Sequence, residues 1–219
     1  MSSKYEAIHF DMDGVIADTE DYHVAAERIT CADYGFAVTE KEWKGFKGRT
    51  ARSIFTYLIE TYGDPQVHHV DALATYKTER FLELVDGKIE PIPGVLPFIE
   101  WARTQHRYVT LVTSSVAPVQ KKIIDTFGIA DVFDAVVTAD VIERGKPDPE
   151  PYLRALGAVG VTGAQSVVIE DSISGLVSGK AAGCSTLAVT TSHIAAELVV
   201  AKPDYIANTY SQAERLLTS

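Results

Sequence analysis

Short runs of apolar, β-branched residues recur along the chain, and longer segments with a helical pattern separate them. Such runs are typical of buried strands. Between them, Pro118 opens a helical segment that Gly128 closes, and another covers 150–156 and stops at Gly157. This alternation predicts an α/β fold with a mainly parallel sheet and helices on both faces. The predicted strands are 7–10, 108–113, 135–138, 166–169 and 185–189.

The interval 18–87 interrupts this alternation, because it contains no convincing strand and has the pattern of several helices. A structureless loop of that length inside a domain would be unusual. We therefore predict an all-helical cap domain at 18–87, inserted after the first strand, and a core domain formed by 1–17 and 88–219. The helical candidates within the cap are 18–34, 50–62 and 66–85.

Composition and charge narrow the class of protein. With 30 acidic and 20 basic residues the net charge is -10, which argues against a nucleic acid as the main partner. No stretch approaches the ~20 consecutive apolar residues of a membrane span, and the N-terminus lacks the layout of a signal peptide. We therefore expect no membrane partner, a cytoplasmic location, and a monomer or weak homo-oligomer. Cys31 and Cys184 have no metal-site spacing and indicate neither zinc nor a disulfide.

Polar side chains cluster where the predicted strands end. In an open parallel sheet, ligands bind outside the carboxyl ends of the strands, so these clusters point to one crevice. They consist of Asp11 and Asp13, Thr113 and Ser114, Lys146, and Glu170 with Asp171.

The clusters together supply what a phosphoryl transfer needs. Carboxylates from Asp11 and Asp171 suit Mg²⁺, which takes few protein oxygens and keeps water and phosphate oxygens as ligands. A carboxylate can also attack phosphorus and form an aspartyl-phosphate intermediate. Lys146 and Thr113 would then bind the phosphoryl group, and Asp13 would act as general acid and base.

Each cluster also has a simpler interpretation when taken alone. Asp-Gly is ordinary turn chemistry, and Lys146 next to a proline would be a plain loop cation. Glu170 and Asp171 would be partners of a helix dipole, worth ~0.3 to 1 kcal/mol. Their joint occurrence after successive strands favours the functional interpretation.

The motifs DMDGV, the strand end at Thr113, the lysine of GKPDPEPY, and VIEDSISGL occur in this order. Together they resemble the haloacid dehalogenase (HAD) superfamily, in its β-phosphoglucomutase-like and phosphatase branch with a helical cap. The resemblance covers essentially the whole chain and implies a Rossmann-like three-layer core. Dehalogenase members lack the second aspartate and phosphonatase members replace it with a small residue, so Asp13 disfavours both chemistries.

The resemblance also implies a role for each motif residue. Asp11 is similar to the family nucleophile and Mg²⁺ ligand, and Asp13 to the acid/base that lends the metal its backbone carbonyl. The phosphate-binding pair would be Thr113 and Lys146, with Ser114 as a further substrate contact. The second carboxylate ligand would be Asp171, with Glu170 coordinating the metal or holding a metal-bound water.

In the cap, His23, Arg52 and Lys77 fall near positions where β-phosphoglucomutase-like proteins contact substrate or close the cap. Gly48 would offer a flexible point near Arg52. The alternative, that these three are ordinary helix-surface residues, stays open.

We therefore predict an enzyme, a Mg²⁺-dependent phosphatase that hydrolyses a small phosphorylated metabolite, a sugar phosphate, through phospho-Asp11. A β-phosphoglucomutase-like phosphohexomutase is the alternative, because it shares the core motifs and differs in the acceptor. A non-catalytic binding protein is less favoured, since loss of Asp11, Asp13 or Lys146 would be its expected mark and all three are present.

Overall fold

The structure is a computed structural model that describes residues 4–46 and 49–218. The chain divides into two compact units, Met1–Asp18 with Glu90–Ser219, and Thr19–Ile89.

A six-stranded sheet forms the centre of the larger unit, in the order β3-β2-β1-β4-β5-β6. All neighbouring strands pair in parallel, and Ala7 of the central strand is in register with Tyr108 on one side and Ser166 on the other. Strands β1 and β4 are buried along their whole length, as expected for strands covered on both faces. The strands are β1 Ala7–Phe10, β2 Tyr108–Val112, β3 Ala135–Val137, β4 Ser166–Glu170, β5 Ser185–Val189 and β6 Tyr205–Ala207.

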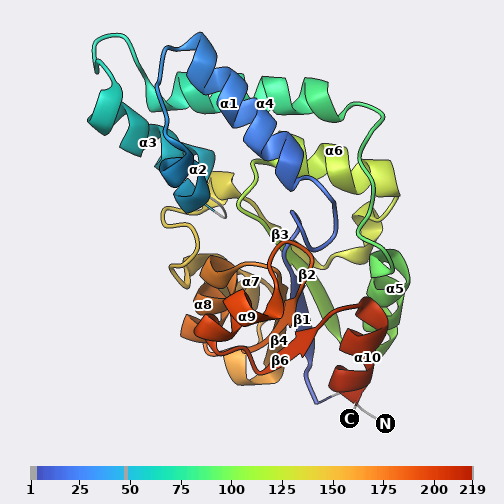
Figure 1. Cartoon of the computed structure of the whole chain (residues 1–219). Coiled ribbons are helices and arrows are strands. Elements are labelled where there is room, and N and C mark those ends of the chain that lie inside the picture. Colours follow the sequence, from blue (N-terminus) through green and yellow to red (C-terminus); the bar gives the residue numbers. More distant parts are fainter. Residues whose placement is uncertain (1–3, 47–48, 219) are drawn as a thin grey trace. The chain divides into compact units, whose positions relative to one another are not determined.

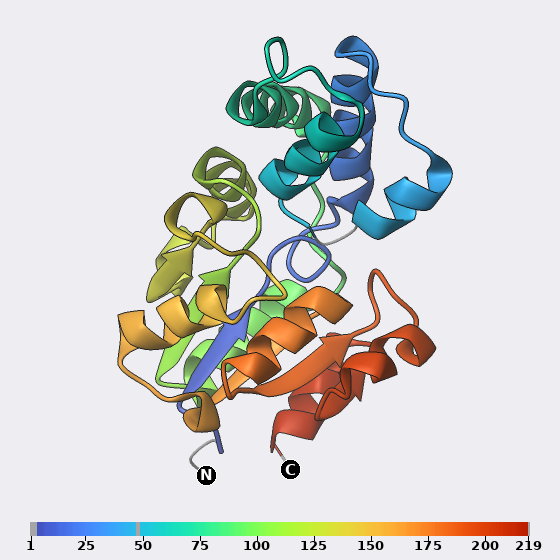
Figure 2. The ribbon, with the colours of Figure 1, turned by 90° about the vertical axis from the view of Figure 1, so that its left-hand side faces the viewer.

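Helices cover both faces of this sheet. Helices α7 and α8 pack on one face, and α5 and α10 pack on the other (Figures 1 and 2). The predicted α/β fold with a mainly parallel sheet and three layers is thereby confirmed. The helices of this unit are α5 Val95–Gln105, α6 Ala117–Phe127, α7 Glu150–Val159, α8 Ile173–Ala181, α9 Ala195–Leu198 and α10 Tyr210–Thr218, with 3-10 turns η1 Ala130–Val132, η2 Ala139–Val141, η3 Gly163–Gln165 and η4 Val199–Ala201.

Helix ends follow the predicted signals with one exception. Helix α6 has Pro118 in its first turn and ends at Gly128 in a left-handed conformation, as predicted. The predicted end of α7 at Gly157 is wrong, because the helix continues to Val159 and ends at Gly160 with φ 70°. A glycine inside a helix costs only ~1 kcal/mol, which packing of the helix on the sheet outweighs.

The smaller unit contains helices and no strand among its described residues, 19–46 and 49–89. Helix α4 packs against α1 and α3. The three helices predicted here are confirmed, and α2 was not predicted; Gly48 lies outside the described residues. The helices are α1 Glu20–Asp33, α2 Glu40–Phe46, α3 Ala51–Tyr62 and α4 Val70–Val85. Their apolar core consists of Cys31, Phe36, Phe46, Ile54, Phe55, Leu58 and Leu73.

Within the described ranges, no helix has both the length and the apolar character needed to cross a bilayer.

Candidate active site

The candidate site lies at the carboxyl ends of β1, β2 and β4, beside the central strand. Strands β2 and β4 flank β1 on opposite sides, so the chain order changes direction there, which is where α/β sheets bind ligands. Asp11 directly follows β1, and its backbone N–H donates to the Ile169 carbonyl at 3.1 Å. Thr113 follows β2, and its N–H donates to the Val137 carbonyl at 2.9 Å. These sheet-like bonds fix both residues at the edge of the sheet.

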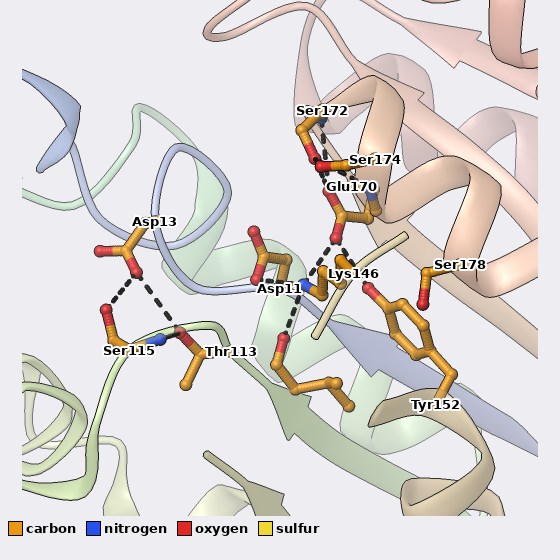
Figure 3. Close-up of polar contacts among 12 residues, drawn as sticks. Asp11, Asp13, Thr113, Ser115, Lys146, Tyr152, Glu170, Ser172, Ser174 and Ser178 are labelled. Atoms are coloured by element: carbon orange, nitrogen blue, oxygen red, sulfur yellow. Dashed lines mark hydrogen bonds and ion pairs between the residues drawn. The ribbon is translucent and has the colours of Figure 1, made fainter. Parts of the chain in front are cut away.

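Lys146 occupies the centre of this site (Figure 3). Its ammonium donates to Asp11 Oδ1 at 2.7 Å, to Glu170 Oε1 at 2.7 Å and to the Val112 carbonyl at 3.0 Å. Its side chain is only 3% exposed, so the charge is held inside the protein. Burial disfavours the charged ammonium, but the carboxylates of Asp11 and Glu170 outweigh burial and raise the pKa of Lys146. Lys146 is therefore a fixed cation in contact with the candidate nucleophile.

Three buried carboxylates surround a common position. Among the described residues, Asp11, Glu170 and Asp171 each offer an oxygen, and these oxygens lie within 4.8 Å of one another. Burial raises the pKa of Asp11 well above its usual range, the Glu170 carboxylate adds to this, and Lys146 opposes it. The single ammonium of Lys146 does not neutralise all three carboxylates, so the group keeps a net negative charge. Its oxygen donors therefore fit a hard divalent cation such as Mg²⁺.

Two glycines make room for these carboxylates. Gly14 has φ +76°, and a Cβ there would lie 2.1 Å from Asp171 Oδ2. A Cβ on Gly175 would lie 1.8 Å from Glu170 Oε1. Both positions require glycine if Glu170 and Asp171 are to keep their orientation.

Donors hold both oxygens of Glu170, which is completely buried. Its Oε1 accepts from the Tyr152 hydroxyl at 2.8 Å in addition to Lys146. Its Oε2 accepts from the Ser172 hydroxyl at 2.9 Å and from the Ser172 N–H at 3.3 Å (Figure 3). Glu170 is thus oriented by four donors from the protein.

Asp13 lies beside the β2–α6 turn. Its Oδ2 accepts from the Ser115 hydroxyl at 2.9 Å and from the Thr113 hydroxyl at 3.3 Å (Figure 3). The Ser115 N–H donates to Thr113 Oγ1 at 3.0 Å, and this hydrogen bond stabilises the turn. Ser114 lies half-buried in the same turn. The structure therefore brings Asp13 into contact with Thr113, one of the residues predicted to bind phosphate.

Sequence reasoning missed three of the side chains that make these contacts, those of Ser115, Tyr152 and Ser172. Tyr152 lies within the quoted motif GKPDPEPY, but its place in an amphipathic helix indicated only packing. Ser115 directly follows Ser114, and nothing in the sequence tells which of the two serines points toward Asp13.

The candidate cap residues have partners within their own unit. The Lys77 ammonium donates to His23 Nδ1 at 2.7 Å and lies 3.9 Å from Glu27 Oε1. The His23 ring stacks on Phe81 with centroids 4.1 Å apart. Lys77 and Glu27 are buried and His23 is half-buried, so Lys77 is not a helix-surface charge.

Arg52 behaves differently from Lys77. It is 62% exposed at its side chain and forms an ion pair with Asp71, which is also exposed. This arrangement within the unit matches an ordinary surface pair.

Comparison with known proteins identifies the family. The family model described as haloacid dehalogenase-like hydrolase matches residues 8–189. Among relatives, the chain is 31% identical over 192 residues to fructose-1-phosphate phosphatase YqaB of Escherichia coli, covering 86% of this chain and 98% of the relative. It is also 31% identical over 181 residues to a phosphorylated carbohydrates phosphatase of Thermotoga maritima, covering 81% of this chain and 82% of the relative.

A solved structure has the same fold over nearly the whole chain. The crystal structure of CbbY from Rhodobacter sphaeroides in complex with phosphate superposes with a TM-score of 0.82 at 26% identity, covering 95% of this chain and 96% of CbbY. The predicted resemblance is confirmed: the chain belongs to the haloacid dehalogenase-like hydrolase family and is an enzyme of its phosphohydrolase type.

Proposed function

We propose that the protein is a Mg²⁺-dependent phosphatase that hydrolyses a small sugar phosphate through a phosphorylated Asp11. The observation that carries the proposal is the contact of the Lys146 ammonium with Asp11 Oδ1 at 2.7 Å, inside a group of three buried carboxylates. This contact holds the carboxylate of a nucleophile in place and sets a positive charge next to an incoming phosphoryl group.

In the first step, an oxygen of Asp11 attacks phosphorus and the bond from phosphorus to the sugar oxygen breaks. Asp13 gives its proton to the departing sugar oxygen, so the sugar leaves as a neutral alcohol. Lys146 stays next to Asp11 and offsets the negative charge of the transferring group. Thr113 and the turn after β2 supply hydroxyl and backbone donors for the phosphoryl oxygens.

In the second step, Asp13 takes a proton from water as the water oxygen attacks phosphorus. The bond from phosphorus to Asp11 breaks, which releases inorganic phosphate and restores the Asp11 carboxylate. The contact of Asp13 with the Ser115 hydroxyl supports this role, because it holds the acid/base in one orientation when the Thr113 hydroxyl donates to the phosphoryl group. The enzyme returns to its starting protonation state.

Asp11, Glu170 and Asp171 would hold the Mg²⁺, with the Asp13 backbone carbonyl as a further ligand carried over from the resemblance. When bound, Mg²⁺ supplies positive charge that offsets the repulsion between these carboxylates and the charge of the phosphoryl group. We assign the unit Thr19–Ile89 the role of a cap that closes over substrate and excludes bulk water. In that assignment His23, Arg52 and Lys77 are candidate contacts for the sugar.

The names of the relatives support a sugar phosphate as the substrate class. One relative is a fructose-1-phosphate phosphatase and another a phosphorylated carbohydrates phosphatase. A phosphohexomutase is the less supported alternative, since both of these relatives carry phosphatase names. Action in the cytoplasm as a monomer or weak homo-oligomer completes the proposal.

The test is a panel of phosphorylated sugars with Mg²⁺, in which free phosphate and isomerised sugar phosphate are both measured. The panel is run with and without a hexose bisphosphate primer, and Asp11→Asn serves as the control for contaminating phosphatase. Phosphate release by the wild type alone is the expected result. Primer-dependent isomerisation without phosphate release would support the mutase instead, and no turnover on any sugar phosphate would overturn both.

A further inference from the structure

Tyr152 is a buried residue of α7 whose ring and hydroxyl have different surroundings. The ring packs in an apolar cluster with Val112, Leu156 and Val168. The hydroxyl donates to Glu170 Oε1 at 2.8 Å (Figure 3). The packing accounts for an aromatic ring at this position but not for the hydroxyl.

The oxygen that Tyr152 contacts is the same oxygen that binds Lys146. The Lys146 ammonium donates to Glu170 Oε1 at 2.7 Å, and it also lies 5.2 Å from the centroid of the Tyr152 ring. Tyr152 therefore contacts both members of the Lys146–Glu170 ion pair, one through its hydroxyl and the other through its ring face. Removing the hydroxyl would leave Lys146 as the remaining donor to Glu170 Oε1 among the described residues.

The hydroxyl acts as a donor in this contact. A carboxylate oxygen has no proton to donate, so the phenol O–H donates and Glu170 Oε1 accepts. The buried Glu170 carboxylate accepts from the Tyr152 hydroxyl and from the Lys146 ammonium. These two donors approach it from different directions and hold it in one rotamer. Since Ser172 holds the other oxygen, the carboxylate plane is also determined.

We propose that Tyr152 is a positioning residue that acts through Glu170 to orient the carboxylate group and Lys146. It touches neither the phosphoryl group nor Asp11 in this scheme. Its effect on turnover rests on the proposed function, whereas its effect on cation binding depends only on the carboxylate group. Loss of a hydrogen bond to a metal-binding carboxylate costs about 10- to 100-fold in metal affinity or activity.

The test uses the whole protein with Tyr152→Phe, which keeps the ring and removes the hydroxyl. Mg²⁺ binding is measured by calorimetry on metal-stripped protein without substrate, and kcat is measured separately on the sugar phosphate panel. We expect Mg²⁺ affinity to fall about 10-fold or more while the thermal midpoint stays close to that of the wild type. The matched control is Tyr5→Phe, which removes a hydroxyl, 3.2 Å from that of Tyr205, before the start of β1 and should leave Mg²⁺ affinity unchanged.

A second comparison tests whether Tyr152 acts through Glu170. In a Glu170→Gln background, Tyr152→Phe should change Mg²⁺ affinity by less than about twofold, because the partner carboxylate is already gone. An equal loss in both backgrounds would mean an independent structural role and would overturn the proposal. Equal Mg²⁺ affinity of Tyr152→Phe and wild type, or no Mg²⁺ binding by the wild type, would also overturn it. If Tyr152→Phe lowers Mg²⁺ affinity as expected but the wild type releases no phosphate from any sugar phosphate, this inference stands and the proposed function is refuted.

Discussion

Replacing Lys146 with methionine would remove the positive charge from the centre of three buried carboxylates. The ammonium lies 2.7 Å from both Asp11 Oδ1 and Glu170 Oε1, and the lysine side chain is 3% exposed. At an effective dielectric constant of about 20, each contact corresponds to a Coulomb energy of about 6 kcal/mol. The cost of burying the ammonium offsets much of this attraction, so we expect a net loss of about 3 to 5 kcal/mol in the free energy of unfolding.

Chemical denaturation of metal-stripped protein measures this loss. Lys121→Met is the matched control, because Lys121 lies in the same unit and pairs with Asp125 at 2.6 Å, but is 74% exposed. An exposed pair of this kind contributes only about 0 to 1 kcal/mol. Added Mg²⁺ should restore part of the stability of Lys146→Met, since a bound cation neutralises the same carboxylates. A loss for Lys146→Met no larger than that for Lys121→Met would refute the reasoning.

Two further predictions concern Asp13 and the buried Glu27 of the smaller unit. The Ser115 hydroxyl donates to Asp13 Oδ2 at 2.9 Å, so Ser115→Ala should lower kcat about tenfold and Ser115→Thr should restore it. An unchanged kcat in Ser115→Ala would contradict the role of Ser115 in orienting Asp13. Burial raises the pKa of Glu27 from 4.5 to about 7, against the opposing charge of Lys77. The stability contributed by protonated Glu27 is therefore full below pH 4.5 and is lost as the pH rises to about 7. The test measures the free energy of unfolding in urea at about pH 5 and about pH 8. The change in this free energy between the two pH values should be smaller for Glu27→Gln than for the wild type. Equal changes would contradict the raised pKa of Glu27.

Much of the sheet could be predicted because its strands are short β-branched runs between clear helix signals. The strand β6, Tyr205–Ala207, was missed because only one of its three residues is β-branched, whereas two of the three residues of β3 are. The helix α2, Glu40–Phe46, was missed because its seven residues make fewer than two helical turns, too few to show a helical period of apolar residues. Local signals therefore failed where elements were short and held by packing.

The site could be predicted to the extent that motif residues follow strand ends, since topology alone brings Asp11, Thr113 and Glu170 to one edge. The residues that orient them could not be predicted in the same way. Tyr152 reaches Glu170 across 18 positions of sequence, from a helix whose face toward the sheet depends on tertiary packing. Nothing in the sequence around Gly175 indicates that its missing Cβ makes room for the Glu170 carboxylate.

The proposed mechanism makes the Asp11 carboxylate the nucleophile. It is tested by measuring kcat of Asp11→Asn with saturating Mg²⁺ and the best substrate of the panel, after circular dichroism has established that the variant is folded. We expect kcat to fall about 10³-fold or more, because an amide cannot form the phosphorylated intermediate. A variant that keeps kcat within about tenfold of the wild type would contradict the covalent mechanism.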